Sequence, residues 1–103
     1  MDSATKILQL RQARDGKSDV PAQRVFNEKE QEGLEKILPQ IEGKTEKLKN
    51  PHPKGTLSRA AWVIARLGGW KGYASSRPPG MKTFKRGLDK FNAMVWAWTI
   101  DSG

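Results

Sequence analysis

The sequence predicts a small all-α domain of three to four helices, joined by a polar, proline-containing arm, on three observations. A chain of 103 residues is long enough for one compact domain but not for two separate cores. Several segments carry apolar residues at helical spacing, and no segment alternates apolar and polar residues over the length of a typical strand. The chain has no cysteine, so its fold depends on neither disulfides nor a thiolate metal site.

The first predicted element is a helix over Ser3–Arg14, within an N-terminal stretch of residues 1–24. Its composition favours a helix, but Ile7, Leu8 and Leu10 are its only large apolar residues. Three such residues cannot stabilise an isolated helix. We therefore expect this segment either to dock on the rest of the chain or to fray, which gives the domain a flexible N-terminus.

The second stretch, residues 25–55, is predicted to hold a charged helix followed by the arm. Asn27 is a candidate N-cap with Glu30 in the capping-box position. Pro39 is predicted to stop this helix, and the charged face of the helix is predicted to be solvated. The polar segment Gln40–Gly55 then forms a connecting arm and contributes no core element.

The third stretch, residues 56–103, is predicted to supply the hydrophobic core. A helix over Thr56–Leu67 begins at a Thr56 cap and ends at Gly68 and Gly69, because a glycine suits the left-handed C-cap. Apolar residues cover most of the circumference of this helix, so we expect it to be buried. Pro78-Pro79-Gly80 predicts a rigid turn before the last helix.

The last helix is predicted over Thr83–Ile100. Five apolar residues in it step by 4, 3, 4 and 3, which is the spacing of a heptad seam: Phe84, Leu88, Phe91, Val95 and Trp98. Two interpretations of this seam stay open, core packed against the preceding helix and an interface for self-association. Trp96 lies away from the seam and is either exposed or placed over a neighbouring element.

Excess positive charge is concentrated in the second half of the chain. Residues 1–50 hold 10 basic and 9 acidic residues, a net of +1, whereas residues 51–103 hold 9 basic and 2 acidic residues, a net of +7. Such asymmetry favours a polyanionic partner, nucleic acid first and an acidic membrane surface second. A solvated basic surface without a partner is the alternative.

Six cations are the candidate nucleic-acid-binding residues, because phosphate contacts from Lys and Arg are strong in sum and independent of sequence. Lys82, Arg86 and Lys90 step by four along the last helix on a face away from the seam. Three more are near them in sequence: Arg66, Lys71 and Arg77. Trp70 and Tyr73 are suited either to stacking on bases or to covering the core, and we favour the core for Trp70.

Residues suited to catalysis are sparse. The single histidine, His52, lies between two prolines and is predicted to be a surface residue. No serine has a base near it in sequence, and the glycines after the buried helix follow no strand and precede no Gly-Lys-Ser/Thr element. We therefore expect no enzyme, no catalytic or metal-binding residue, no cofactor and no small-molecule substrate.

Long apolar segments are also lacking. The sequence has no run of about 18 apolar residues, and its first residues do not form an apolar signal region. We expect neither a membrane span nor a secretory signal, and we expect the protein in the cytoplasm.

Four segments together resemble the C-terminal region of bacterial DDE transposases, in the insertion-sequence family that includes the transposase of the kanamycin-resistance transposon: Asn50–Pro53, Ala60–Tyr73, Pro78–Gly80 and Arg86–Leu88. Most of the specificity is in Ala61–Gly80, with its structural motif residues Gly68, Gly69, Trp70, Pro78, Pro79 and Gly80. Shorter likenesses upstream extend the resemblance to nearly the whole chain: Ile7–Arg11, Val25-Phe26 and Glu42–Glu46.

Members of this family cut and join transposon ends in a dimeric protein–DNA complex, using three acids that bind divalent metal in an RNase-H-like core. No acid of this chain matches those positions, so the resemblance implies a chain without that core. It implies a helical dimerisation domain or a truncated remnant, associated with the nucleoid, with the seam as its dimerisation residues. Its partners would be a second copy or a full-length transposase, and mainly the backbone of DNA. The alternative is a small basic nucleic-acid-binding module.

Overall fold

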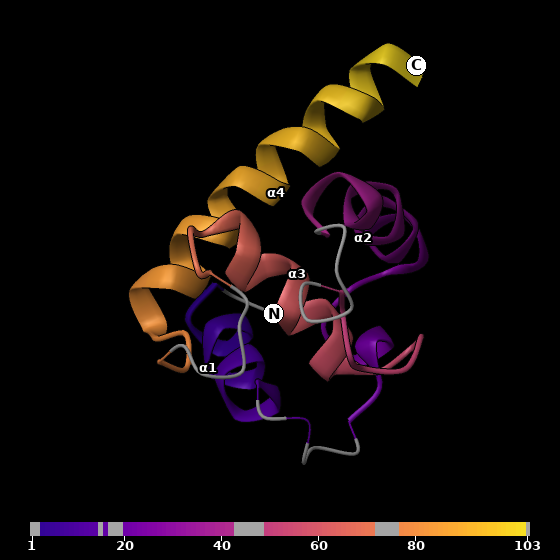
Figure 1. Cartoon of the computed structure of the whole chain (residues 1–103). Coiled ribbons are helices and arrows are strands. Elements are labelled where there is room, and N and C mark those ends of the chain that lie inside the picture. The colour runs from indigo at the N-terminus through magenta and orange to yellow at the C-terminus, as the bar shows by residue number, and fades with distance from the viewer. Residues whose placement is uncertain (1–2, 15, 17–19, 43–48, 72–76, 103) are drawn as a thin grey trace.

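The computed structural model of the chain confirms the all-α fold (Figure 1). It describes residues 3–14, 16, 20–42, 49–71 and 77–102. Within these residues there are no strands, and the helices are α1 (Ser3–Ala13), the short 3-10 helix η1 (Ala22–Arg24), α2 (Glu28–Ile41), α3 (Leu57–Leu67) and α4 (Met81–Ser102).

Helix α3 is the centre of the fold, with α1, α2, α4 and η1 all packed against it (Figure 1). Its side chains from Ala60 to Ala65 are all buried, which confirms the prediction of a helix enclosed on most of its circumference. The Thr56 side chain accepts a hydrogen bond from the Arg59 N–H (3.2 Å), as the N-cap prediction requires. At the other end Gly69 adopts the left-handed conformation, with φ of +100°.

Two glycines let α4 approach α3 closely. A Cβ atom added to Gly68 would collide with the backbone carbonyl of Thr83, and one added to Gly87 would collide with the carbonyl of Ile64. Because of these two close approaches, the first half of α4 packs directly on the backbone of α3 and of its C-cap. Helix α4 begins two residues before and ends two residues after the predicted Thr83–Ile100.

Helix α1 docks instead of fraying. Its apolar residues Ile7, Leu10 and Ala13 are buried against α3 and α4. The guanidinium of Arg14, just after the helix, donates a hydrogen bond to the Pro79 carbonyl (2.8 Å). Of the three large apolar residues that could not stabilise an isolated helix, Ile7 and Leu10 are buried once α3 and α4 supply a surface, whereas Leu8 is 47% exposed.

Helix α2 begins as predicted, with both hydrogen bonds of the capping box between Asn27 and Glu30. The prediction that Pro39 stops this helix is wrong, because the helix continues to Ile41 with the proline inside it. Proline removes one donor, but the Leu38 carbonyl still accepts from the Glu42 N–H (2.9 Å). So close to the end of the helix, the loss of that single hydrogen bond does not terminate it.

Candidate association and nucleic-acid surfaces of helix α4

The heptad seam of α4 divides into a buried part and a partly covered part. Phe84, Leu88 and Phe91 are buried within the single chain. The Phe91 ring packs edge-on against Phe26, with 5.8 Å between the ring centroids. These three residues are therefore core, and an interface between copies could use them only if the domain opened.

The second part of the seam packs against α2. Val95 and Trp98 are partly buried. The Trp98 ring lies over Gly33, where an added Cβ would be 2.6 Å from its Cζ3 atom. The Lys36 ammonium lies 6.0 Å from the same ring. Helix α2 therefore covers Trp98, the last residue of the seam that the sequence offered for self-association.

An apolar surface lies on the opposite side of this end of α4, and of its residues the sequence analysis considered only Trp96. Trp96 is 68% exposed and Ile100 is 55% exposed, and Ala93 and Ala97 beside them are also exposed. Their spacing of three and four residues places them on one helix face. The last turns of α4 extend beyond the rest of the molecule (Figure 1). We call these four residues the apolar end of α4; the same spacing in the sequence could have revealed them.

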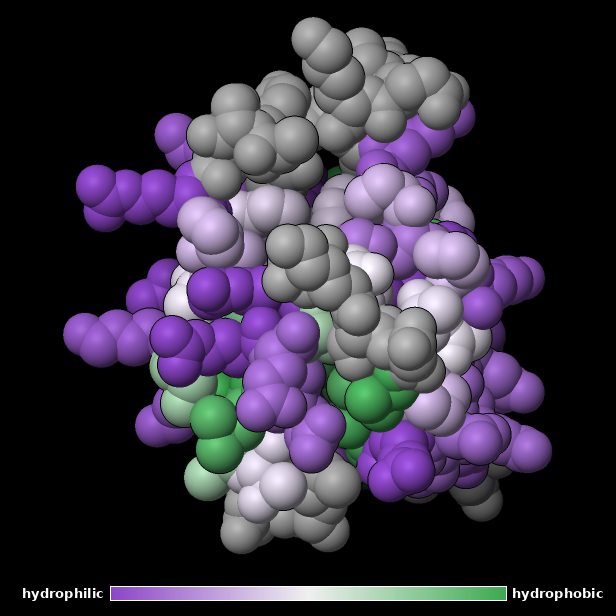
Figure 2. Space-filling model, turned by 90° about the horizontal axis from the view of Figure 1, so that it is seen from below, coloured by the Kyte–Doolittle hydropathy of each residue, from purple (hydrophilic) through white to green (hydrophobic). Residues whose placement is uncertain are grey.

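Such exposure is unusual for this molecule. On the face shown in Figure 2, hydrophilic residues dominate and hydrophobic ones form small separate patches. Only two other large hydrophobic residues within the described part of the chain are similarly exposed, Leu8 at 47% and Met81 at 41%. Of the exposed large hydrophobic residues, only Trp96 and Ile100 follow each other by one turn on a single helix.

Five of the six predicted nucleic-acid-binding cations are exposed: Lys71, Arg77, Lys82, Arg86 and Lys90. Lys85, which the sequence analysis did not select, is exposed on α4 beside them. We call Lys82, Lys85, Arg86 and Lys90 the cationic face of α4. On the same helix, the buried seam residues fix the orientation of this face.

Arg66, the sixth predicted cation, makes structural contacts. Its guanidinium donates to the carbonyls of Trp70 (2.9 Å), Lys71 (2.9 Å) and Ile41 (2.8 Å). It also lies over the Trp62 ring, 5.8 Å from the centroid. These bonds tie the end of α3 to the end of α2 and leave little of Arg66 for a phosphate.

The motif residues around Arg66 build the connection from α3 to α4. The Trp70 indole N–H donates to the Arg77 carbonyl (2.8 Å), and its ring packs edge-on against Trp62. Trp70 is half-buried and covers the core, as favoured from the sequence, while Tyr73 lies outside the described residues. Pro79 is buried against α1 through its bond with Arg14, and the Gly80 carbonyl accepts from the Phe84 N–H at the start of α4.

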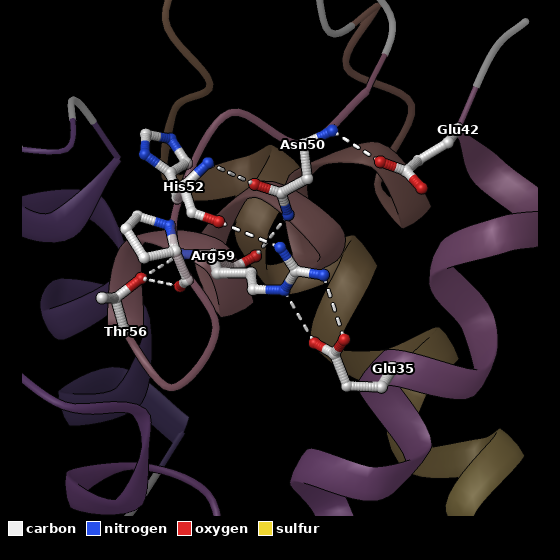
Figure 3. A network of polar contacts seen from close by, with 7 residues as sticks. Glu35, Glu42, Asn50, His52, Thr56 and Arg59 are labelled. Carbon is white, nitrogen blue, oxygen red and sulfur yellow. Dashed lines mark hydrogen bonds and ion pairs between the residues drawn. The ribbon is translucent and has the colours of Figure 1, made fainter.

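A second polar cluster holds the connecting arm (Figure 3). Arg59 on α3 forms a bidentate ion pair with Glu35 on α2 (2.8 and 3.0 Å) and donates to the His52 carbonyl (2.9 Å). Asn50 binds the Arg59 carbonyl and, through its backbone N–H, the Glu42 carboxylate (2.7 Å). Glu35 belongs to the charged face of α2 that was predicted to be solvated, but it is paired with Arg59 instead.

The electrostatics of this cluster follow from the ion pair. The hydrogen bond from Arg59 is the main cause that lowers the pKa of the Glu35 carboxyl below its ordinary value. The pKa of Arg59 is raised further by the same bond. The cluster contains a salt bridge and satisfied backbone groups, with no nucleophile and base in contact, which is an arrangement for joining segments.

The same side of the molecule carries an open groove of about 570 Å³ between α2, η1 and the start of α3. Its floor is apolar and its rim is charged, with Glu35 and Arg59 at one edge. The floor residues Leu34, Ala60 and Val63 are almost fully covered by their neighbours. The groove therefore offers a shallow surface with little apolar area to bury.

Within the described residues, no three His, Asp or Glu side chains come close enough together to hold a metal ion. No helix there is long and apolar enough to cross a membrane. Comparisons with protein-family models, with curated proteins and with solved structures give no match. The resemblance to the transposase C-terminal region therefore depends on the sequence motifs alone.

Proposed function

We propose that this chain is a non-catalytic association domain of the kind found at the C-terminus of DDE transposases, or a truncated remnant of such an enzyme. In this role it supports DNA transposition by joining a second copy or a full-length transposase, with auxiliary contact to DNA. The observation that carries the proposal is the apolar end of α4, where Trp96 and Ile100 are exposed on a helix end that extends from the body.

The proposal assigns association to a different face from the predicted seam. Because Phe84, Leu88 and Phe91 are core and α2 covers Trp98, the contact between copies uses Ala93, Trp96, Ala97 and Ile100. This face needs no opening of the domain. It also leaves the packing of α4 on α3 unchanged in the associated state.

The size of the apolar end limits the strength of association. Burying a Trp side chain covers about 150–250 Å², and the smaller neighbours add less, whereas a standard interface buries about 800 Å² per partner. Each copy also carries a net charge of +8, so two copies repel each other. We therefore expect a weak dimer whose affinity rises with salt concentration, because salt screens that repulsion.

Sedimentation equilibrium of the full chain tests this proposal. Trp96→Glu combined with Ile100→Glu is expected to give a folded monomer at concentrations where the unchanged chain is partly dimeric. The matched control is Leu8→Glu with Met81→Glu, which removes two exposed apolar residues and adds the same charge elsewhere. Equal loss of dimer in both double variants, or a monomeric unchanged chain at millimolar concentration, contradicts the proposal.

The transposase assignment has its own test. A chain that forms mixed dimers with a full-length transposase of this family supplies no second catalytic core, so added chain is expected to lower transposition in vitro. The Trp96→Glu, Ile100→Glu variant should leave transposition unchanged, because it cannot form the mixed dimer. No inhibition at large molar excess contradicts the remnant role while leaving self-association to be judged by sedimentation.

A second candidate function is a monomeric basic module that binds nucleic acid through phosphate contacts. The exposed cations along one face of α4 favour it. If the chain is monomeric in sedimentation equilibrium but binds DNA, the second candidate function replaces the first.

A further inference from the structure

The cationic face of α4 is a surface of predominantly positive charge on a helix that is packed against α3. Lys82, Arg86 and Lys90 recur every four residues and Lys85 lies beside them, with Asp89 as the single acid between Met81 and Ile100. All of these charged side chains are exposed. Because the opposite side of the same turns is buried against α3, the cations point in a fixed direction.

The turn before α4 and the end of α1 enlarge this surface. Arg77 is exposed directly before the turn. Arg14 reaches the turn from α1, since its guanidinium donates to the Pro79 carbonyl at 2.8 Å. The turn and the distant end of α1 therefore both bring positive charge to the start of α4.

Other cations of the chain are placed differently. Arg59 is paired with Glu35, and Arg66 donates to three backbone carbonyls at 2.8–2.9 Å. Arg86 on α4, by contrast, makes one long hydrogen bond of 3.5 Å to the Gly68 carbonyl. On α2 the exposed lysines alternate with acids: Glu28, Lys29, Glu30, Glu32, Glu35 and Lys36. Among the described residues, a long array of cations with a single acid therefore occurs along α4 and the turn before it.

We infer that the cationic face of α4, with Arg77, binds the sugar–phosphate backbone of duplex DNA without reading its sequence. This inference rests on the auxiliary DNA contact of the proposed function and names the residues that make that contact. From Lys82 to Lys90 the face is about 12 Å long at 1.5 Å per residue. The four cations of the face, together with Arg77, are enough for about three to four phosphate contacts on duplex DNA.

Duplex DNA fits this surface better than single-stranded nucleic acid. Proteins that hold single strands combine cations with exposed aromatic rings on which bases stack. Between Lys82 and Lys90 the only aromatic residue is Phe84, which is buried. Trp70 covers the core, and Trp96 lies about 9 Å beyond Lys90 along the axis.

The experiment measures binding of the full chain to a labelled 20-base-pair duplex by fluorescence anisotropy over a series of salt concentrations. Three to four phosphate contacts predict a slope of log affinity against log salt of about −3. Lys82→Gln, Arg86→Gln and Lys90→Gln together should flatten the slope to about −1 and weaken binding at least tenfold at low salt.

A matched triple variant controls for net charge. Arg24→Gln, Lys29→Gln and Lys54→Gln remove three exposed cations outside α4, so both triple variants lose the same charge. This control should weaken DNA binding less than about threefold, since distant charges are screened at moderate salt. Equal losses in the two triple variants overturn the inference, because binding would then follow total charge.

Three further measurements distinguish duplex binding by the cationic face from binding through the apolar end or to another polyanion. The Trp96→Glu, Ile100→Glu variant should still bind duplex DNA with the single-copy slope, whether or not the unchanged chain dimerises. Tighter binding to a single-stranded oligonucleotide than to the duplex overturns the inference. Stronger binding to vesicles of phosphatidylserine and phosphatidylcholine than to the duplex, lost in the Trp96→Glu, Ile100→Glu variant, also overturns the inference. Such a result would show that a membrane surface contacts both the cationic face and the apolar end of α4.

Discussion

The two halves of α4 share one heptad spacing but lie in different surroundings. In the first half, Phe84 and Phe91 are enclosed in the core and the outward side is cationic. In the second half, Val95 and Trp98 are only partly buried, Trp98 lies against α2, and the outward side is apolar. The contrast shows that one heptad seam can be enclosed in the core along one half of a helix and only partly covered along the other half, while the outward face changes from cationic to apolar.

The first and largest test of this contrast removes a seam residue from the buried half. Phe91→Ala should lower the free energy of unfolding by about 3–5 kcal/mol, because it leaves a cavity among enclosed side chains. Urea denaturation measures the loss, and the milder Phe91→Leu keeps the domain folded if the alanine variant unfolds. Trp96→Ala is the control and should change stability by less than about 0.5 kcal/mol. Similar values for the two alanine variants would remove the distinction between the faces.

The second test concerns the closest approach of the two helices. Gly87→Ala should destabilise the domain by about 1–3 kcal/mol, because the new Cβ meets the backbone carbonyl of Ile64, which cannot move alone. An ordinary exposed helical glycine would instead gain about 1 kcal/mol from this change. Thermal unfolding followed by circular dichroism distinguishes the two signs, and a stabilised variant would mean that α4 is loosely seated.

The third test applies the same substitution to the other contact of α4. Gly33→Ala also creates a short contact, but with the Trp98 ring, a side chain that can rotate. The gain in helix propensity of α2 offsets the repacking, so stability should change by less than about 1 kcal/mol. The indole N–H resonance of Trp98 should shift in the NMR spectrum. A loss as large as that of Gly87→Ala would show that the second half of α4 is held as tightly as the first.

The smallest expected effect comes from the ion pair that holds the arm, away from α4. Ionised Glu35 is stabilised by Arg59, so its pKa in the folded chain lies below the ordinary value of 4.5. The stability it contributes is present above pH 4.5 and is lost as the pH falls through the folded pKa. Because the carboxylate is partly exposed, we expect this contribution to be below about 1 kcal/mol.

Urea denaturation of the unchanged chain and of Glu35→Gln over a pH series measures this contribution. The difference between them should be constant above about pH 5.5 and should shrink below the ordinary carboxyl pKa. Glu28→Gln, on the exposed first turn of the same helix, is the control. A difference that grows toward low pH would contradict the assignment.

Local signals in the sequence predicted much of this fold. The capping box at Asn27, the cap at Thr56 and the helix end at Gly69 are short-range features, and the structure confirms each of them. The enclosed helix α3 followed from its density of apolar residues. These features depend on neighbouring residues and can therefore be read from a single sequence.

The missed features depend on contacts between distant segments. The sequence left docking and fraying of α1 as alternatives, because the choice depends on the surfaces of α3 and α4. The extension of α2 past Pro39 was missed, because one residue type does not decide where a helix ends. The seam at Phe84–Trp98 specifies which residues share a face but not what covers that face. By charge alone, Arg66 could not be distinguished from the cations of α4. In the structure it lies on α3, and its guanidinium donates hydrogen bonds to three backbone carbonyls.

The bond between Arg14 and the Pro79 carbonyl joins residues 65 positions apart. Contacts of such range raise the contact order of a helical domain and slow its folding. During synthesis at about 5–20 residues per second, α1 leaves the ribosome first and waits on the order of several seconds for α4. Until then the apolar side of α1, with Leu10 and Ala13, has no surface of α4 to cover it, so α1 reaches its packed state only after α4 has been made.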